Sequence, residues 1–189
     1  MKCICCKLSK IDLAIIIISA LISAGYFLFY LLNKDYAMML LSFTIVVSPF
    51  VLYLIDRKYK MNDWFEFYII IFIFLSVVLG MIMNLYNYVP GYDKFVHFIS
   101  GILISALIYE KIHSYNKIKK YSLTISIITL NLFIALLWEF FEFILDLLFD
   151  VNAQKGTRDT ILDVVFAVSG SILFIFIYRR KNNYFFGKR

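Results

Sequence analysis

The sequence has few charged residues for its length. Only 17% of its 189 residues are Asp, Glu, Lys or Arg, whereas 62% are apolar and the mean hydropathy is +0.83. Soluble domains are close to half apolar and about a quarter charged. This composition excludes an ordinary soluble domain and predicts an integral membrane protein.

Cysteine is also scarce, and the familiar enzyme motifs are absent. Cys3, Cys5 and Cys6 all lie in the first six residues. We expect reduced thiols there, since disulfides are rare in the cytoplasm, with acylation or metal binding as alternatives. The sequence has no H-E-x-x-H, G-x-S-x-G or Walker motif and no adjacent glutamate pair of the intramembrane-protease type. Whether the chain is an enzyme therefore stays open.

Long apolar runs predict about six transmembrane helices. A bilayer core of about 30 Å requires about 20 apolar residues in a helix. Five runs meet that length, and the run Phe95 to Tyr109 is shorter but has polar flanks. The five longer runs are Leu13 to Leu32, Tyr36 to Ile55, Phe65 to Tyr86, Ser122 to Leu148 and Thr160 to Tyr178. The predicted fold is an all-α polytopic membrane helix bundle, and we expect Pro49 to kink its second span.

The basic residues predict which way these helices run. Fifteen of the nineteen lie before the first span, in the second and fourth loops or in the tail, and only Lys34, Lys94, Lys155 and Arg158 lie on the other side. Because basic loops remain in the cytoplasm, both termini are predicted to be cytoplasmic. This asymmetry explains the net charge of +6 without nucleic acid as a partner.

The chain is predicted to be a single membrane domain, residues 1–189, with an uneven distribution of polar groups. Residues 1–89 form an apolar three-helix scaffold, residues 90–178 form three helices that carry nearly all the membrane-embedded polar groups, and residues 179–189 form a basic cytoplasmic tail. Chemistry is therefore expected in the second half.

Ionisable side chains of the last three spans are expected to meet near the outer leaflet. Asp93 begins the fourth span, with His97 one turn deeper, and Asp163 lies one turn below Asp159 on the sixth. On the fifth span Glu139, Glu142 and Asp146 share one face. With Asp150, seven carboxylates occupy this region and outnumber the nearby cations. Like charges repel, so some carboxylates keep their protons or a cation is bound.

One imidazole among carboxylates suits a divalent ion such as Mn, Mg, Fe or Zn, so a divalent metal ion is the candidate cofactor. The candidate metal ligands are Asp93, His97, Glu139, Glu142, Asp159 and Asp163. Glu142 and His97 are the candidate catalytic residues, with Glu142 as general base for a metal-bound water. Candidate supporting residues are Asp146, Gln154, Arg158, Gly101 and Gly170, of which the glycines belong to small-residue helix faces that allow close approach.

Three functions remain open from these residues. The leading one is binding of a cation or a cationic headgroup, with action on an envelope lipid or lipid-linked precursor. The second is a small proton-coupled transporter. The third is a non-catalytic assembly subunit whose carboxylates only hold the bundle together, for example through Asp93 with Lys94 or Arg158. The lipid bilayer is the one expected partner, and no residue identifies a protein partner.

The order of the polar motifs resembles that of the YjdF-like family of bacterial inner-membrane proteins and, more loosely, the VanZ-like family. The matching pieces are Tyr92-Asp93-Lys94-x-x-His97-Phe98-x-x-Gly101, Glu110, Trp138-Glu139-x-x-Glu142, Gln154, Asp159-Thr160-x-x-Asp163 and Gly170. The resemblance implies a multi-pass protein of the bacterial cytoplasmic membrane, and the VanZ-like family would imply an effect at the outer face of the envelope.

The chain departs from both patterns. VanZ-like proteins usually have Glu-x-x-Gln where this chain has Glu139-x-x-Glu142, and Asn where it has Ala167. YjdF-like proteins often carry a histidine before the Tyr-rich stretch, where this chain has Asn84. The missing imidazole weakens any metal assignment that the resemblance would carry over.

Overall fold

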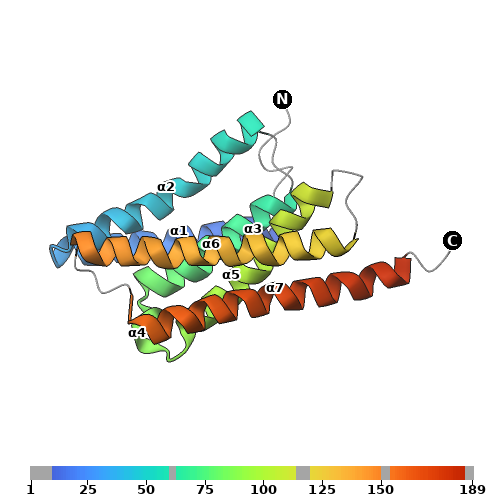
Figure 1. The fold of residues 1–189 in the computed structure, drawn as a ribbon. Coiled ribbons are helices and arrows are strands. Elements are labelled where there is room, and N and C mark those ends of the chain that lie inside the picture. The colour runs from blue at the N-terminus through green and yellow to red at the C-terminus, as the bar shows by residue number, and fades with distance from the viewer. Residues whose placement is uncertain (1–9, 60–62, 114–119, 150–153, 186–189) are drawn as a thin grey trace. The chain divides into compact units, whose positions relative to one another are not determined.

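The computed structural model describes residues 10–59, 63–113, 120–149 and 154–185 (Figure 1). Throughout these residues the regular structure is helical, as the sequence predicted. Cys3, Cys5, Cys6 and Asp150 lie outside the described residues. The helices are α1 (Lys10–Leu32), α2 (Tyr36–Tyr59), α3 (Asp63–Ile73), the π-helix η2 (Phe74–Ile82), α4 (Leu85–Tyr88), α5 (Tyr92–His113), α6 (Lys120–Phe149) and α7 (Thr157–Phe185).

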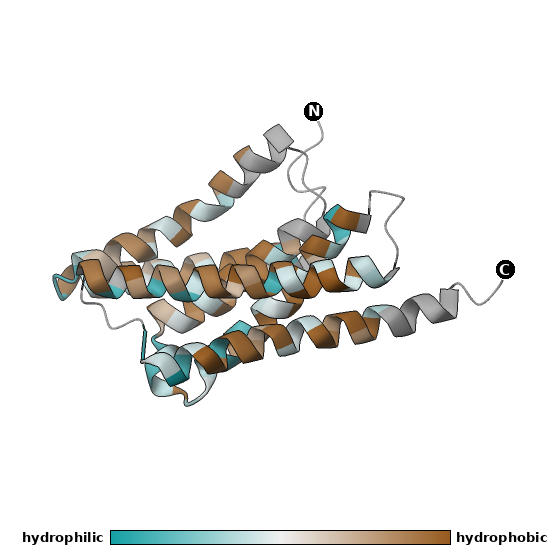
Figure 2. Cartoon of the chain, in the orientation of Figure 1, coloured by the Kyte–Doolittle hydropathy of each residue, from teal (hydrophilic) through white to brown (hydrophobic). Residues whose placement is uncertain are grey.

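Within the described residues, four helices are long and apolar enough to cross a membrane. They cover Asp12–Leu32, Tyr92–Ile112, Tyr121–Leu148 and Thr157–Tyr178. Two shorter apolar helices, Tyr36–Val51 and Phe67–Ile82, correspond to the second and third predicted spans. The fourth predicted span is longer than expected, because α5 begins at Tyr92 and the polar residues of its first turns are helical. The chain is therefore a polytopic helical membrane protein. Its long helices are mostly hydrophobic, with hydrophilic residues gathered at the start of α7 (Figure 2).

The third predicted span, Phe65 to Tyr86, is not one continuous helix. It changes at Phe74 into η2, where the Met83 N–H donates to the Val78 carbonyl five residues back. Asn84 then adopts a left-handed conformation with φ of 62°, which ends the helix and separates it from α4. The hydropathy of an apolar run reveals neither π-type hydrogen bonding nor a left-handed asparagine. The helix predicted from the sequence was therefore too long.

Pro49 lies inside α2 without ending it. A proline cannot donate to the carbonyl four residues earlier, which here belongs to Ile45. The Ser48 hydroxyl donates to that carbonyl instead, over 2.9 Å. A neighbouring side chain thus satisfies the backbone group that proline leaves without its helical partner, as membrane helices require.

The chain divides into two compact units, residues 1–92 and 93–189. In the first unit α1 and α2 form an antiparallel pair (Figure 1) that packs with α3 and η2. Its buried apolar centre is Ile45, Val78 and Ile82. Two tyrosine hydroxyls bind η2 carbonyls: Tyr30 donates to Ile82 over 2.9 Å and Tyr92 to Leu75 over 2.7 Å.

In the second unit α6 runs antiparallel to α7 (Figure 1). Each helix buries a stripe of residues that recur every four positions. The stripes are His97, Gly101 and Ser105 on α5; Leu123, Ile127, Asn131, Ala135 and Glu139 on α6; and Asp163, Ala167, Ser171 and Ile175 on α7. Residues four apart lie on one helix face, so these stripes form the shared core of the unit. The core is polar at the level of His97, Glu139 and Asp163 and apolar around Ile108, Leu123, Ile127 and Ile175.

Candidate functional site

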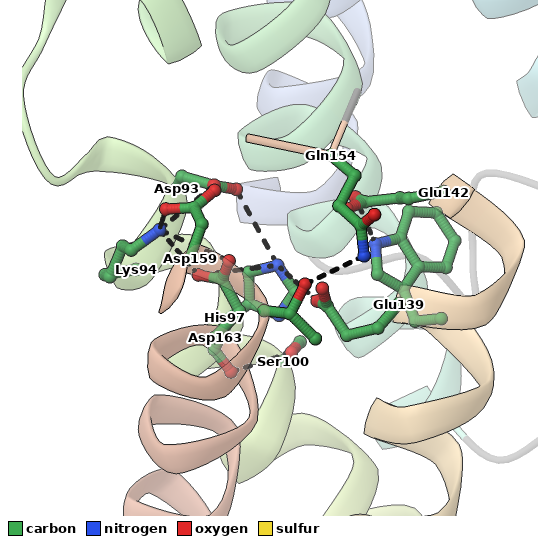
Figure 3. Close-up of polar contacts among 11 residues, drawn as sticks. Asp93, Lys94, His97, Ser100, Glu139, Glu142, Gln154, Asp159 and Asp163 are labelled. Carbon is green, nitrogen blue, oxygen red and sulfur yellow. Dashed lines mark hydrogen bonds and ion pairs between the residues drawn. The ribbon is translucent and has the colours of Figure 1, made fainter. Parts of the chain in front are cut away.

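The first two turns of α5 supply three ionisable side chains. Asp93 lies in the first turn, where the helix dipole favours an acidic group. His97 follows one turn later, and its Nε2 lies 3.6 Å from Asp93 Oδ1. Lys94 projects from the same turn as Asp93 toward the start of α7 (Figure 3). The i, i+4 spacing noted in the sequence thus places the imidazole directly beneath the aspartate.

The start of α7 supplies the second group of carboxylates. Gly156 has φ of +105°, a conformation that L residues rarely adopt, and its carbonyl accepts hydrogen bonds from the Asp159 and Thr160 N–H groups. This turn starts α7 so that Asp159 occupies its first turn and Asp163 its second. Asp163 is almost completely buried, at 1% exposure. The helix start therefore places one carboxylate at the rim and one in the core.

The α6 stripe ends in Glu139, which is 4% exposed. Its Oε1 lies 3.8 Å from His97 Nε2 and has no hydrogen-bond partner. The Thr160 hydroxyl accepts a hydrogen bond from the Gln154 side chain over 2.9 Å and also interacts with the Glu139 carboxyl group. A buried carboxylate oxygen with no hydrogen-bond partner is costly, because burial removes its water.

Lys94 is the cation nearest to these carboxylates. Its Nζ lies 3.0 Å from Asp163 Oδ1 and 3.5 Å from Asp93 Oδ2, and it also forms an ion pair with Asp159. It donates a hydrogen bond to Asp163 Oδ2 over 3.2 Å. Asp163 Oδ1, although close to the ammonium, makes no hydrogen bond. We call these six residues the polar cluster: Asp93, Lys94, His97, Glu139, Asp159 and Asp163.

Three members of the polar cluster lie close enough together that they could hold a metal ion. Asp93, His97 and Asp163 each present one ligand atom, and these atoms lie within 4.8 Å of one another. His97 Nε2 is 3.6 Å from Asp93 Oδ1 and 3.9 Å from Asp163 Oδ1. An ion about 2.0–2.2 Å from each ligand holds ligand atoms at most about 4.4 Å apart. Both distances from the imidazole are within that limit.

Other residues predicted for the site lie outside the polar cluster, and two of them accept hydrogen bonds. Glu142 Oε1 accepts a hydrogen bond from Trp138 Nε1 over 2.8 Å (Figure 3). Asp146 Oδ2 accepts one from the Gln154 backbone N–H over 2.7 Å. The Arg158 side chain is exposed. Of the two cations considered for Asp93 from the sequence, the structure pairs it with Lys94.

Two glycines set the distance between α5 and α7. A Cβ at Gly101 would overlap the Ala167 carbonyl, and a Cβ at Gly170 would overlap the Phe98 carbonyl. Each helix thus places backbone against a glycine of the other. This close contact brings the first turns of α5 and α7 near enough for Lys94 to reach both aspartates of α7.

The sequence reasoning overlooked Asn131. Its side chain is fully buried, and its amide nitrogen donates to the Gly101 carbonyl over 2.8 Å and to Ser105 Oγ over 3.0 Å. Ser105 in turn donates to Ser171 Oγ over 2.9 Å. The signal was available, because an asparagine in an otherwise apolar stretch of a span is a candidate for bonding between membrane helices.

Comparisons with known proteins give a family and one relative. A family model described as predicted membrane protein, DUF2238, matches residues 13–183. An uncharacterised protein of Thermotoga maritima is 31% identical over 118 residues, which are 60% of this chain and 62% of the relative, so less than two thirds of the relative's length is matched. No solved structure matches the chain significantly. The family match is consistent with the YjdF-like resemblance, and these matches do not support the VanZ-like one.

Proposed function

This chain belongs to the DUF2238 family of predicted membrane proteins, and from that premise we propose that it binds a divalent metal ion near one end of its membrane spans. The ligands in this proposal are Asp93, His97 and Asp163, with Glu139 as a fourth. The observation that carries it is the mutual approach of one imidazole and two carboxylates from α5 and α7 to within 4.8 Å, with Asp163 and His97 buried.

Two buried oxygens support a cation at this point. Glu139 Oε1 and Asp163 Oδ1 make no hydrogen bond, and both lie within 4 Å of His97 Nε2. Both side chains are more than nine-tenths buried. A metal ion between these atoms would give Glu139 Oε1 a positive partner and would take the place of the Lys94 ammonium at Asp163 Oδ1.

The charge balance favours a dication. The polar cluster has four carboxylates and one lysine, so it is short of positive charge unless protons or a cation are added. Carboxylates with a single imidazole are the ligand set of Mn²⁺, Fe²⁺, Zn²⁺ or Mg²⁺ rather than of a soft metal. Glu142 lies outside the proposed ligand set, and its Oε1 accepts a hydrogen bond from Trp138 Nε1. If the bound ion supplied acid–base chemistry, Glu142 would be the general base that we propose for it.

The site's biological setting follows from its proposed orientation. We place the protein in the bacterial cytoplasmic membrane with the polar cluster toward the outer face, because the basic residues gather on the other side. A metal ion at that depth is within reach of phosphate-bearing headgroups of envelope lipids or lipid-linked precursors. Such a lipid is the ligand class we propose for the bound ion.

The test measures metal content after purification in detergent. We expect about one divalent ion per chain in the wild type by plasma mass spectrometry, and a loss of roughly tenfold or more in affinity for His97→Ala and Asp163→Asn. The matched control is Glu110→Gln, which removes a carboxylate from the far end of the same helix. That variant should keep the ion.

The folding stability of each protein is measured beside its metal content, so that loss of the ion is not confused with unfolding. If the wild type takes up no divalent ion at millimolar concentrations while it remains folded, the proposal is wrong. If the ion is present but survives both ligand substitutions, the ion is bound elsewhere and the assignment to the polar cluster is wrong.

A further inference from the structure

Lys94 contacts two of the residues that a metal ion would need, and at Asp163 it contacts the oxygen that faces His97. Its ammonium contacts Asp163 Oδ1 at 3.0 Å and Asp93 Oδ2 at 3.5 Å, and both residues are proposed ligands. It also pairs with Asp159, which is not one of the proposed ligands. One lysine thus joins carboxylates of α5 and α7 at the same place where the ion is proposed (Figure 3).

The polar cluster has a rim and a floor. At the rim, the side chains of Asp93, Lys94 and Asp159 are 20%, 16% and 20% exposed. At the floor, those of Asp163, Glu139 and His97 are 2%, 5% and 9% exposed. Lys94 is therefore more exposed than Asp163, whose buried Oδ1 its ammonium contacts.

An ammonium and a dication cannot share these oxygens without strong repulsion, because like charges within a few ångströms of each other are unfavourable where water is excluded. The lysine already pairs with Asp159 at the rim, and its long flexible side chain can keep that contact while the ammonium moves away from Asp163. Movement of the ammonium by that route would free Asp163 and leave the Lys94–Asp159 pair intact.

We propose that Lys94 is an internal counter-ion that closes the site in the metal-free protein and must leave Asp163 when a divalent ion binds. This inference rests on the proposed function. It explains how several buried carboxylates are tolerated without a metal, since the ammonium neutralises part of their charge. It also makes the site selective for divalent ions. At Asp163, exchange of the ammonium for Na⁺ or K⁺ adds no charge, whereas exchange for a divalent ion adds one.

The experiment compares Mn²⁺ affinity by titration calorimetry in the folded, detergent-purified full chain. Lys94→Met keeps an unbranched side chain one atom shorter than lysine and removes its charge. Mn²⁺ should therefore bind about tenfold tighter or more, and added Mn²⁺ should raise the unfolding temperature of this variant more than that of the wild type. Lys94→Arg keeps the charge and should remain within a few-fold of the wild type. Lys111→Met, at the far end of the same helix, is the matched control and should leave affinity unchanged.

The outcomes separate the inference from the proposal beneath it. If the wild type binds Mn²⁺ and Lys94→Met binds it no more tightly, the counter-ion role is wrong and the metal site is retained. Binding by Lys94→Met alone supports the counter-ion role and overturns metal binding as the wild-type function. No binding by either folded protein overturns both. If folded Lys94→Met protein is recovered only when Mn²⁺ is present, the metal ion replaces the lysine charge, as proposed. The affinity measurement is then repeated with Lys94→Gln.

Discussion

At the scale of single residues, two serines of α7 show how the surroundings of a hydroxyl group decide its contribution to stability. Ser171 is fully buried and accepts a hydrogen bond from Ser105 on α5. Ser169 is exposed and donates to the Val165 carbonyl of its own helix. The first bond joins two helices, whereas the second satisfies a group that is already bonded within its helix.

We therefore expect Ser171→Ala to destabilise the protein and Ser169→Ala to have almost no effect. Hydrogen bonds between membrane helices contribute about 0.6 kcal/mol on average and about 1.7 kcal/mol at most. Unfolding in mixed detergent measures both variants under the same conditions. Equal free energies of unfolding for the two variants would show that the Ser105–Ser171 bond does not stabilise the unit.

Residue identity alone predicted most members of the polar cluster, but of their partners it suggested only Lys94 or Arg158 for Asp93. Acidic residues and a histidine are conspicuous in apolar spans, so Asp93, His97 and Glu139 could be singled out from the sequence. The contacts of Lys94 with Asp159 and Asp163 of α7 were not predicted. Its central place depends on the distance between α5 and α7, which no local pattern specifies.

At the scale of elements, the packing of α5 against α7 determines whether the polar cluster exists. Gly101 and Gly170 each lie against a backbone carbonyl of the opposite helix. A methyl group at Gly101 must push α7 away, because the atom that it would meet is backbone and cannot rotate aside. The site and the helix contact are therefore expected to fail together.

We predict that Gly101→Ala costs about 1–3 kcal/mol through overpacking and also weakens divalent metal binding. Gly25→Ala in α1 is the control, because a Cβ there meets nothing within 4 Å and alanine is the better helix former by about 1 kcal/mol. Thermal unfolding and metal titration are measured on both variants. A Gly101→Ala protein as stable as Gly25→Ala would contradict the close helix contact.

Elements differ in how far the sequence could predict them. The bounds of α6 and α7 contain the predicted runs because apolar length and charged flanks are direct signals of a span. The break at Phe74 to Asn84 depends instead on tertiary contacts, such as the bond from Tyr30 to the Ile82 carbonyl. Such contacts override local propensity and are invisible in a hydropathy profile.

The element contacts also bear on the transporter alternative. Below the bonded group of Asn131, Ser105 and Ser171, the second unit is filled by Ile108, Leu123, Ile127 and Ile175. Tyr109 and Tyr178 are hydrogen-bonded beyond this apolar layer. Among the described residues of this unit, polar groups therefore occur at three levels that apolar or small side chains separate. This arrangement favours a fixed binding site over a conducting path.

At the scale of the whole molecule, the strongest sequence signal is the uneven distribution of basic residues. Four helices of the described chain are able to cross a membrane and two shorter apolar ones accompany them, in agreement with a polytopic protein. Helix bounds do not say which end of each span faces the cytoplasm. The orientation rests on fifteen basic residues against four, and the outward position of the polar cluster depends on it.

We expect both termini in the cytoplasm and the loop before α7 outside. In a background with Cys3, Cys5 and Cys6 changed to serine, Lys155→Cys should react with a membrane-impermeant maleimide in intact cells. Lys111→Cys, at the other end of α5, should react only after the cells are permeabilised. Its lack of reaction in intact cells is the control for leaky cells. The opposite labelling pattern would place Asp93 and Asp159 at the cytoplasmic face. An ion bound there would meet cytoplasmic ligands, and a role on envelope lipids at the outer face would be excluded.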